Sequence, residues 1–215
     1  ATGERISMIT IYLIRHGQTP GNLQRRYVGC TDEPLCSTAI EQICAQGELY
    51  RKAFSTTGGG KTLETIYVSP MLRCKQTAEL LFPGVGQTVV TDFREMDFGA
   101  FEYKNYQELS ADVRYQAFID SGGQTDFPEA ETQSHFRARV TRAFGHCVAE
   151  LLECDESTGV FVIHGGTVMA ILEAYAKPHK SYFEWQIEAG AGYCCELEVE
   201  ENGFCLTHLR LIANG

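Results

Sequence analysis

The chain has 215 residues, of which 44% are hydrophobic, and it carries a formal net charge of −10. This length suits a single domain over residues 1–215, with room for an inserted cap. The acidic balance disfavours nucleic acid and anionic membranes as partners, and no apolar run is long enough to span a bilayer. Nine cysteines without a C-x-x-C pair predict reduced thiols, so we expect a cytoplasmic protein.

The first predicted element is a buried strand over residues 9–14, an apolar and β-branched run. Residues 1–7 precede Met8, and we expect them to be a cloning remnant outside the fold. The strand ends in Arg15 and His16, and ligands of open α/β sheets bind at such carboxyl ends. Because Arg15 would repel a metal cation, the pair favours an anion, and arginine suits phosphate well. Two solvated polar residues at a strand end are the simpler alternative.

The next segments alternate between helices and strands. Residues 17–36 are rich in turn formers and predict a loop, and residues 55–61 predict a Ser/Thr/Gly linker. Ser69 and Pro70 predict the N-cap and the first residue of a helix that follows a strand directly. The predicted helices cover residues 37–54, 69–82, 131–153 and 167–176, and the later strands cover residues 63–68, 87–90, 160–163, 191–199 and 204–211.

This order predicts an α/β fold, a three-layer α/β/α sandwich whose mostly parallel sheet has an antiparallel edge. The edge is a hairpin that turns at residues 201–203. A helical cap insertion is expected over about residues 98–145, a stretch that begins polar and aromatic. The aromatic residues Phe98, Phe101, Tyr103 and Tyr106 either line this cap or pack it, and the sequence leaves both open.

Five residues that can carry chemistry fall at predicted strand ends. His16 and His164 each end a strand, and Arg73 lies in the first turn of a helix that follows one. Glu95 follows the strand at 87–90, and Arg15 precedes His16. Each alone is explained by a solvated loop or helix charge. Because carboxyl ends of parallel strands share one rim, the five together predict an anion pocket beside a positive helix N-terminus.

Four segments resemble the histidine phosphatase superfamily, the phosphoglycerate mutase-like fold. Residues 13–19, Leu-Ile-Arg-His-Gly-Gln-Thr, resemble its signature, and residues 69–78, 94–99 and 164–166 resemble its later blocks in order. The resemblance implies that His16 is the nucleophile that becomes phosphohistidine and that Glu95 is the proton donor. It implies that Arg15, Arg73 and His164 hold the phosphoryl oxygens.

The same resemblance suggests further substrate contacts. Asn22, in the loop after the nucleophile, would contact phosphate. Residues 25–35, with Gly29, look like the loop of α-ribazole phosphatases and small phosphatases of this type. Gly165 belongs to the last block, and Glu131 keeps an acidic position that many relatives have at the start of the long cap helix.

The expected function is a phosphomonoester hydrolase that uses a phosphohistidine intermediate on a small phosphorylated metabolite, with α-ribazole 5′-phosphate among the candidates. No metal and no other cofactor is expected, because two arginines take the role that a metal would fill. A homodimer is compatible with the sequence. The alternatives are a phosphoglycerate mutase and a non-catalytic phospholigand-binding protein. Gly166 stands where mutases resemble one another in having Asn, which favours hydrolysis.

Overall fold

The computed structural model describes residues 8–57, 63 and 65–212. The expectation for residues 1–7 and most of the predicted linker at 55–61 therefore lie outside the described residues. In the described part, no helix combines the length and apolarity that crossing a membrane requires. All nine cysteines belong to this part, and each is a free thiol.

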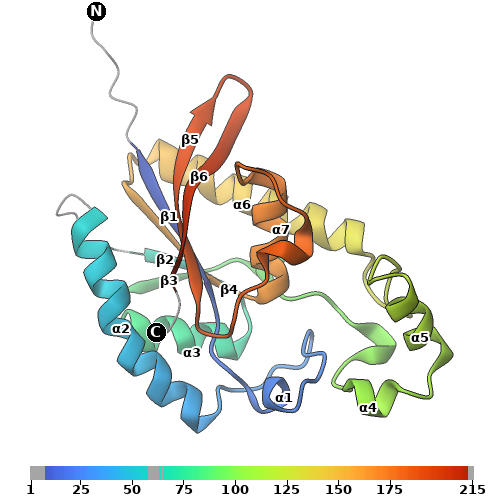
Figure 1. Cartoon of the computed structure of the whole chain (residues 1–215). Helices are drawn as coiled ribbons and strands as arrows, with labels where there is room; N and C mark the ends of the chain where they lie inside the picture. Colours follow the sequence, from blue (N-terminus) through green and yellow to red (C-terminus); the bar gives the residue numbers. More distant parts are fainter. Residues whose placement is uncertain (1–7, 58–62, 64, 213–215) are drawn as a thin grey trace, which may run out of the picture.

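The described strands form one six-stranded sheet in the order β3-β2-β4-β1-β5-β6 (Figure 1). Strands β1 (Ile9–Arg15), β2 (Thr65–Val68), β3 (Gly86–Val89) and β4 (Thr158–Ile163) run parallel. Strand β5 (Gly192–Glu200) pairs antiparallel with β1, and β6 (Gly203–Ile212) pairs antiparallel with β5. The predicted mostly parallel sheet with an antiparallel hairpin at its edge is confirmed.

Helices cover both faces of the sheet, because its central strands are apolar on both sides. Tyr12 and Ile14 of β1 pack in one core with α2 (Ser37–Thr57) and α3 (Leu72–Leu81). Ile11 and Leu13 point the other way, into a core shared with α6 (Gln133–Glu153) and α7 (Gly165–Tyr175). These two cores give the three layers that the sequence predicts.

Three helix starts differ from the prediction, and one of them is that of α6, which begins at Gln133, two residues later than predicted. The N-cap of α3 is Met71, so a helix capped by Ser69 with Pro70 as its first residue is wrong. The Ser69 hydroxyl lies 2.6 Å from His164 Nε2 in a buried tertiary hydrogen bond, and its oxygen also accepts from Met71 N at 3.4 Å, before the helix begins. Helix α7 begins at Gly165, two residues earlier than predicted, with His164 as its N-cap residue.

The loop predicted after β1 contains a short helix, α1 (Pro20–Leu23). Thr19 caps it, since its hydroxyl accepts from the Asn22 backbone N–H while the Asn22 side chain accepts from the Thr19 N–H. Figure 1 places α1 at the end of the molecule toward which β1 runs. This turn of helix therefore fixes Asn22 beside the carboxyl rim of the sheet.

Short elements join β3 to α6 and carry much of the aromatic content. They are η1 (Thr91–Phe93), η2 (Gly99–Phe101), α4 (Tyr106–Leu109) and α5 (Val113–Asp120). Phe101 and Phe127 pack in the same core as α6 and the sheet, and their rings lie 5.9 Å apart. Helix α6 runs unbroken through residue 145, so the predicted cap boundary falls inside a helix. An inserted cap over 98–145 stays a prediction.

Candidate active site

The fold gathers the five candidate residues from separate elements at one rim of the sheet. Arg15 ends β1 and His16 follows it, while His164 follows β4, the parallel neighbour of β1. Arg73 is the second residue of α3, and Glu95 comes shortly after η1. The rings of His16 and His164 meet edge to face with their centres 5.1 Å apart.

The environment of His16 favours a neutral imidazole with one free ring nitrogen. Its Nδ1 lies 2.7 Å from the Gly17 carbonyl oxygen. Because a carbonyl only accepts hydrogen bonds, Nδ1 carries the proton and Nε2 keeps a free lone pair. Burial, followed by the cations of Arg73 and Arg15, holds the pKa of His16 well below its ordinary value. The imidazole is therefore uncharged and nucleophilic at neutral pH.

Arg15 and Arg73 form a cationic cluster in which some N–H donors have no partner among the described residues. Arg73 is fully buried, and its terminal nitrogens donate to the carbonyls of Thr31 (2.8 Å) and Gly29 (3.0 Å). Arg15 Nη1 donates to the Ile187 carbonyl at 2.7 Å. Both Nε atoms are buried and have no hydrogen-bond partner among the described residues. A buried cationic donor of this kind is satisfied by an anion such as phosphate.

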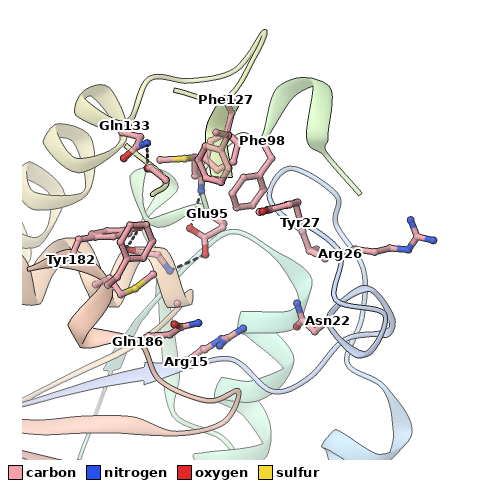
Figure 2. Close-up of a pocket in the computed structure, with 18 residues that line it drawn as sticks. Arg15, Asn22, Arg26, Tyr27, Glu95, Phe98, Phe127, Gln133, Tyr182 and Gln186 are labelled. Carbon is pink, nitrogen blue, oxygen red and sulfur yellow. Dashed lines mark hydrogen bonds between the residues drawn. The ribbon is translucent and has the colours of Figure 1, made fainter. Parts of the chain in front are cut away.

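The Glu95 carboxyl group is held by two backbone N–H groups. Met96 N donates to Oε1 at 3.0 Å, and Gly166 N, in the first turn of α7, donates to Oε2 at 3.1 Å (Figure 2). Burial raises the pKa of Glu95, and this effect outweighs the two hydrogen bonds and the nearby arginines. A Cβ atom at position 166 would lie only 2.3 Å from Oε1, so glycine is needed there. The carboxyl group is thus suited to keep a proton for transfer.

His164 is fully buried behind His16. Its Nε2 is hydrogen-bonded to Ser69 Oγ, which fixes the orientation of the ring. Burial and the charge of Arg73 hold the pKa of His164 well below its ordinary value. Ser69 is a site residue that the sequence analysis missed, since a serine before proline at a helix start is explained by capping alone.

A cavity of about 420 Å³ opens beside this cluster (Figure 2). Four predicted residues line it, namely Arg15, Asn22, Glu95 and Gly165. The buried residues His16, Arg73 and His164 are not among its lining residues. Of the four aromatic residues whose role the sequence left open, Phe98 lines the cavity and Phe101 is fully buried in the core.

Gly29 has a structural role in the loop beside Arg73. Its carbonyl accepts from Arg73, its N–H donates to Glu102 at 2.9 Å, and it does not line the cavity. A Cβ atom there would come within 2.0 Å of the Met96 carbonyl oxygen, which explains the glycine. Both backbone polar groups of Gly29 therefore bind protein, and its contact with substrate stays a prediction.

Glu131 also lies away from the cavity and pairs with a buried arginine. Both carboxylate oxygens accept from Arg139, at 2.6 and 2.8 Å. Arg139 in turn donates to the carbonyls of Asp92 (2.6 Å), Arg94 (2.9 Å) and Glu95 (3.1 Å). Glu131 therefore supports the loop that carries Glu95, and its contact with substrate stays a prediction. The sequence signal for Arg139 was an arginine on the apolar face of a helix.

One group of possible metal ligands occurs among the described residues, outside this cluster. Cys30, Asp97 and Glu102 place their ligand atoms within 4.8 Å of one another. Glu102 Oε1 already accepts from the N–H groups of Gly29 and Thr31, and Asp97 Oδ1 accepts from Gly99 N. These carboxylates are therefore engaged in holding loop backbone.

Comparison with known proteins places this geometry in a family. The model of the histidine phosphatase superfamily (branch 1) matches residues 11–211. The chain is 27% identical over 169 residues to a probable phosphoglycerate mutase GpmB of Erwinia tasmaniensis, covering 77% of this chain and 73% of that protein. It is 29% identical over 162 residues to the protein of the same name from Proteus mirabilis, covering 74% and 70%.

Solved structures agree with this assignment. The phosphoglycerate mutase of Thermus thermophilus matches with a TM-score of 0.64 and 26% identity, covering 96% of this chain and all 100% of that chain. The α-ribazole phosphatase of Shigella flexneri matches with a TM-score of 0.73 over 96% of both chains, and its 20% identity supports the fold alone. Since the family model spans nearly the whole chain, the protein belongs to the histidine phosphatase superfamily, whose members are phosphatases and mutases.

Proposed function

We propose that the protein hydrolyses a small phosphomonoester through a phosphohistidine intermediate. The observation that carries this proposal is the Nδ1–H hydrogen bond of His16 to the Gly17 carbonyl, which leaves Nε2 free beside two buried arginine donors. A nucleophile of defined tautomer next to an anion pocket is what phosphoryl transfer requires. The pocket and His16 alone would suit a protein that only binds phosphate. Catalytic turnover also needs a proton donor for the leaving group, and Glu95 supplies it in this proposal.

The reaction has two steps. In the first, His16 Nε2 bonds to phosphorus as the ester P–O bond breaks, and the Glu95 carboxyl protonates the departing alkoxide. In the second, Glu95 takes a proton from water as that water attacks phosphorus and the P–N bond breaks, which releases phosphate and restores His16. Arg15 and Arg73 stabilise the charge on the phosphoryl oxygens in both steps, because preorganised cations lower such barriers.

Hydrolysis is favoured over phosphoglycerate mutase activity by the charges of the cavity. A mutase must bind the substrate carboxylate as well as its phosphate. Among the described lining residues, the cations are Arg15 and Arg26. Arg26 already donates to Glu108 at 2.7 Å and to the Tyr103 carbonyl, so its charge is paired. Phosphoglycerate mutase is kept as the second candidate because curated relatives carry that name.

Phosphate release from p-nitrophenyl phosphate, compared between wild type and His16→Ala, tests the proposal. We expect turnover in the wild type and its loss in the variant. A folded wild-type protein without turnover on a panel of esters would favour a non-catalytic phospholigand-binding protein. Isomerisation of 3-phosphoglycerate much faster than phosphate release would establish the mutase. The same panel, with α-ribazole 5′-phosphate and sugar phosphates included, identifies the substrate.

A further inference from the structure

Aromatic side chains wall the part of the cavity that lies beyond the acid. Figure 2 shows Glu95 between Arg15 on one side and Phe98 and Phe127 on the other. If the phosphoryl group lies at Arg15, the ester oxygen of the leaving group lies next to Glu95. The rest of the leaving group then extends toward the rings. The aromatic residues lining the cavity are Tyr27, Phe98, Phe118, Phe127, Tyr182 and Phe183.

Four rings of this aromatic wall, those of Tyr27, Phe98, Phe118 and Phe127, are already packed against one another. The ring centres of Tyr27 and Phe98 lie 5.2 Å apart, those of Phe98 and Phe127 lie 5.0 Å apart, and those of Phe118 and Phe127 lie 4.7 Å apart. Tilted and edge-to-face contacts at these distances are favourable and hold each ring in place. A planar ring that enters the cavity therefore meets a prearranged surface, which lowers the entropic cost of binding.

Two polar side chains that line the cavity, those of Gln133 and Arg26, are engaged with protein. Gln133 Nε2 donates to the carbonyls of Gly123 (2.9 Å) and Thr125 (2.8 Å). Arg26 is paired with Glu108, as described above. A polyol or a second anionic group beside these two side chains would lose its hydration and gain few new partners from them, which is unfavourable. An apolar ring loses nothing comparable and gains the contact with the wall.

We propose that these six aromatic residues form a subsite for an aromatic ring in the leaving alcohol, so that the preferred substrates are phosphate monoesters of uncharged, ring-bearing alcohols. The catalytic part of this inference rests on the proposed hydrolase function, whereas the binding part stands on the cavity alone. The volume of about 420 Å³ falls in the range of small-molecule sites, so it suits a substrate of one phosphate and a small ring system.

Turnover of two matched esters tests the catalytic part. The leaving groups of 2-phenylethyl phosphate and glycerol 3-phosphate are both primary alkoxides, so the two esters differ mainly in the presence of the ring. We expect kcat/KM to be about 10- to 100-fold higher for the phenyl ester, from burial of the ring. Phe183 is 49% exposed, so Phe183→Ala removes part of the wall at small cost to folding. This variant should lower the preference about three- to tenfold.

The matched control is Tyr106→Ala, because Tyr106 is 50% exposed and does not line the cavity. The preference for the phenyl ester should be unchanged in this variant. Equal kcat/KM for the two esters in an active wild-type enzyme would overturn the proposal. So would a preference that Phe183→Ala and Tyr106→Ala reduce equally.

Calorimetry with phosphonates separates the subsite from catalysis. Benzylphosphonate and methylphosphonate cannot be hydrolysed, so their affinities for the wild-type protein are independent of turnover. We expect benzylphosphonate to bind about tenfold or more tightly than methylphosphonate. Tighter binding in a protein without phosphatase activity would retain the subsite and refute the hydrolase function. Equal affinities in an active enzyme would refute the subsite and retain the hydrolase function.

Discussion

Replacing Glu95 by glutamine isolates the work of the proposed acid. Glu95 is the one carboxyl group among the described residues that line the cavity, so no neighbour there can take over proton transfer. Glutamine keeps the shape of the side chain and one oxygen that can accept from Met96 N or Gly166 N. The principal change is therefore the loss of the transferable proton, with the carboxyl hydrogen-bond pair reduced by one acceptor.

The expected loss depends on the leaving group. On an alkyl phosphate, Glu95→Gln should lower kcat by about 10²–10⁴, the usual contribution of general acid catalysis. At about 1.36 kcal/mol per tenfold, this corresponds to about 2.7–5.4 kcal/mol of transition-state stabilisation. On p-nitrophenyl phosphate the departing anion is stable without a proton, so the loss in the phosphorylation step should be much smaller.

Single-turnover kinetics measure the phosphorylation step apart from the later hydrolysis of phosphohistidine. Any disturbance of geometry by Glu95→Gln affects both esters alike, so the ratio of the two losses reports proton donation alone. Equal losses on the alkyl and the aryl ester would refute the assignment of Glu95 as the acid. That outcome would give Glu95 a positioning role, through its hydrogen bond to Gly166 at the start of α7.

Three further outcomes test the site. Arg139→Met should lower the free energy of unfolding by about 3–5 kcal/mol, because it leaves the poorly exposed Glu131 carboxylate without its buried arginine, and the exposed His135 is then its remaining ion-pair partner among the described residues. Urea denaturation checks this, and Arg142→Met, at an exposed position of the same helix, should stay within about 0.5 kcal/mol of wild type. For p-nitrophenyl phosphate, kcat/KM corrected for the ionisation of the substrate should hold steady from about pH 7 to about pH 6, since the pKa of His16 lies well below its ordinary value of about 6.5. A fall centred near that ordinary value would show that the resting imidazole is not held neutral by burial. A chelator should leave turnover unchanged and vanadate should compete with substrate, whereas revival of a chelated enzyme by magnesium would show that a metal does the work assigned here to arginine.

The residues at strand ends could be predicted from the sequence because their signals are local. An apolar run that stops at Arg15 and His16 predicts a buried strand and a polar end, and parallel pairing then brings such ends to one rim. The same logic placed His164 and Glu95. The burial pattern of β1 follows directly from its continuous apolar sequence, as expected for a strand covered on both faces.

The structural roles of Gly29, Glu131 and Ser69 depend on partners that are distant in the chain. Gly29 binds Arg73, which lies 44 positions away, and Glu131 binds the backbone of the acid loop through Arg139. Ser69 is hydrogen-bonded to His164, 95 positions away. Local patterns carry no information about such pairings, so capping propensity and sequence resemblance gave these residues a different role.

The aromatic wall could not be predicted from local sequence patterns either. Its members come from the loop after α1, the segment between β3 and α6, and the η3 turn (Tyr182–Trp185), so the cavity exists only after folding. In the sequence, each ring alone is typical of a core residue, and Phe101 shows that some are. Only their arrangement around one cavity distinguishes the lining rings from the packing ones.

Trapping the phosphoenzyme tests the central claim most directly. Wild-type protein is mixed with a radiolabelled phosphate ester and quenched within the first turnover under alkaline conditions, which preserve phosphohistidine. We predict one label per chain, stable in base and lost in acid, that maps to the peptide containing His16 and is absent from His16→Gln. A folded, active enzyme that carries no such label, or a label that persists in His16→Gln, would contradict the phosphohistidine mechanism.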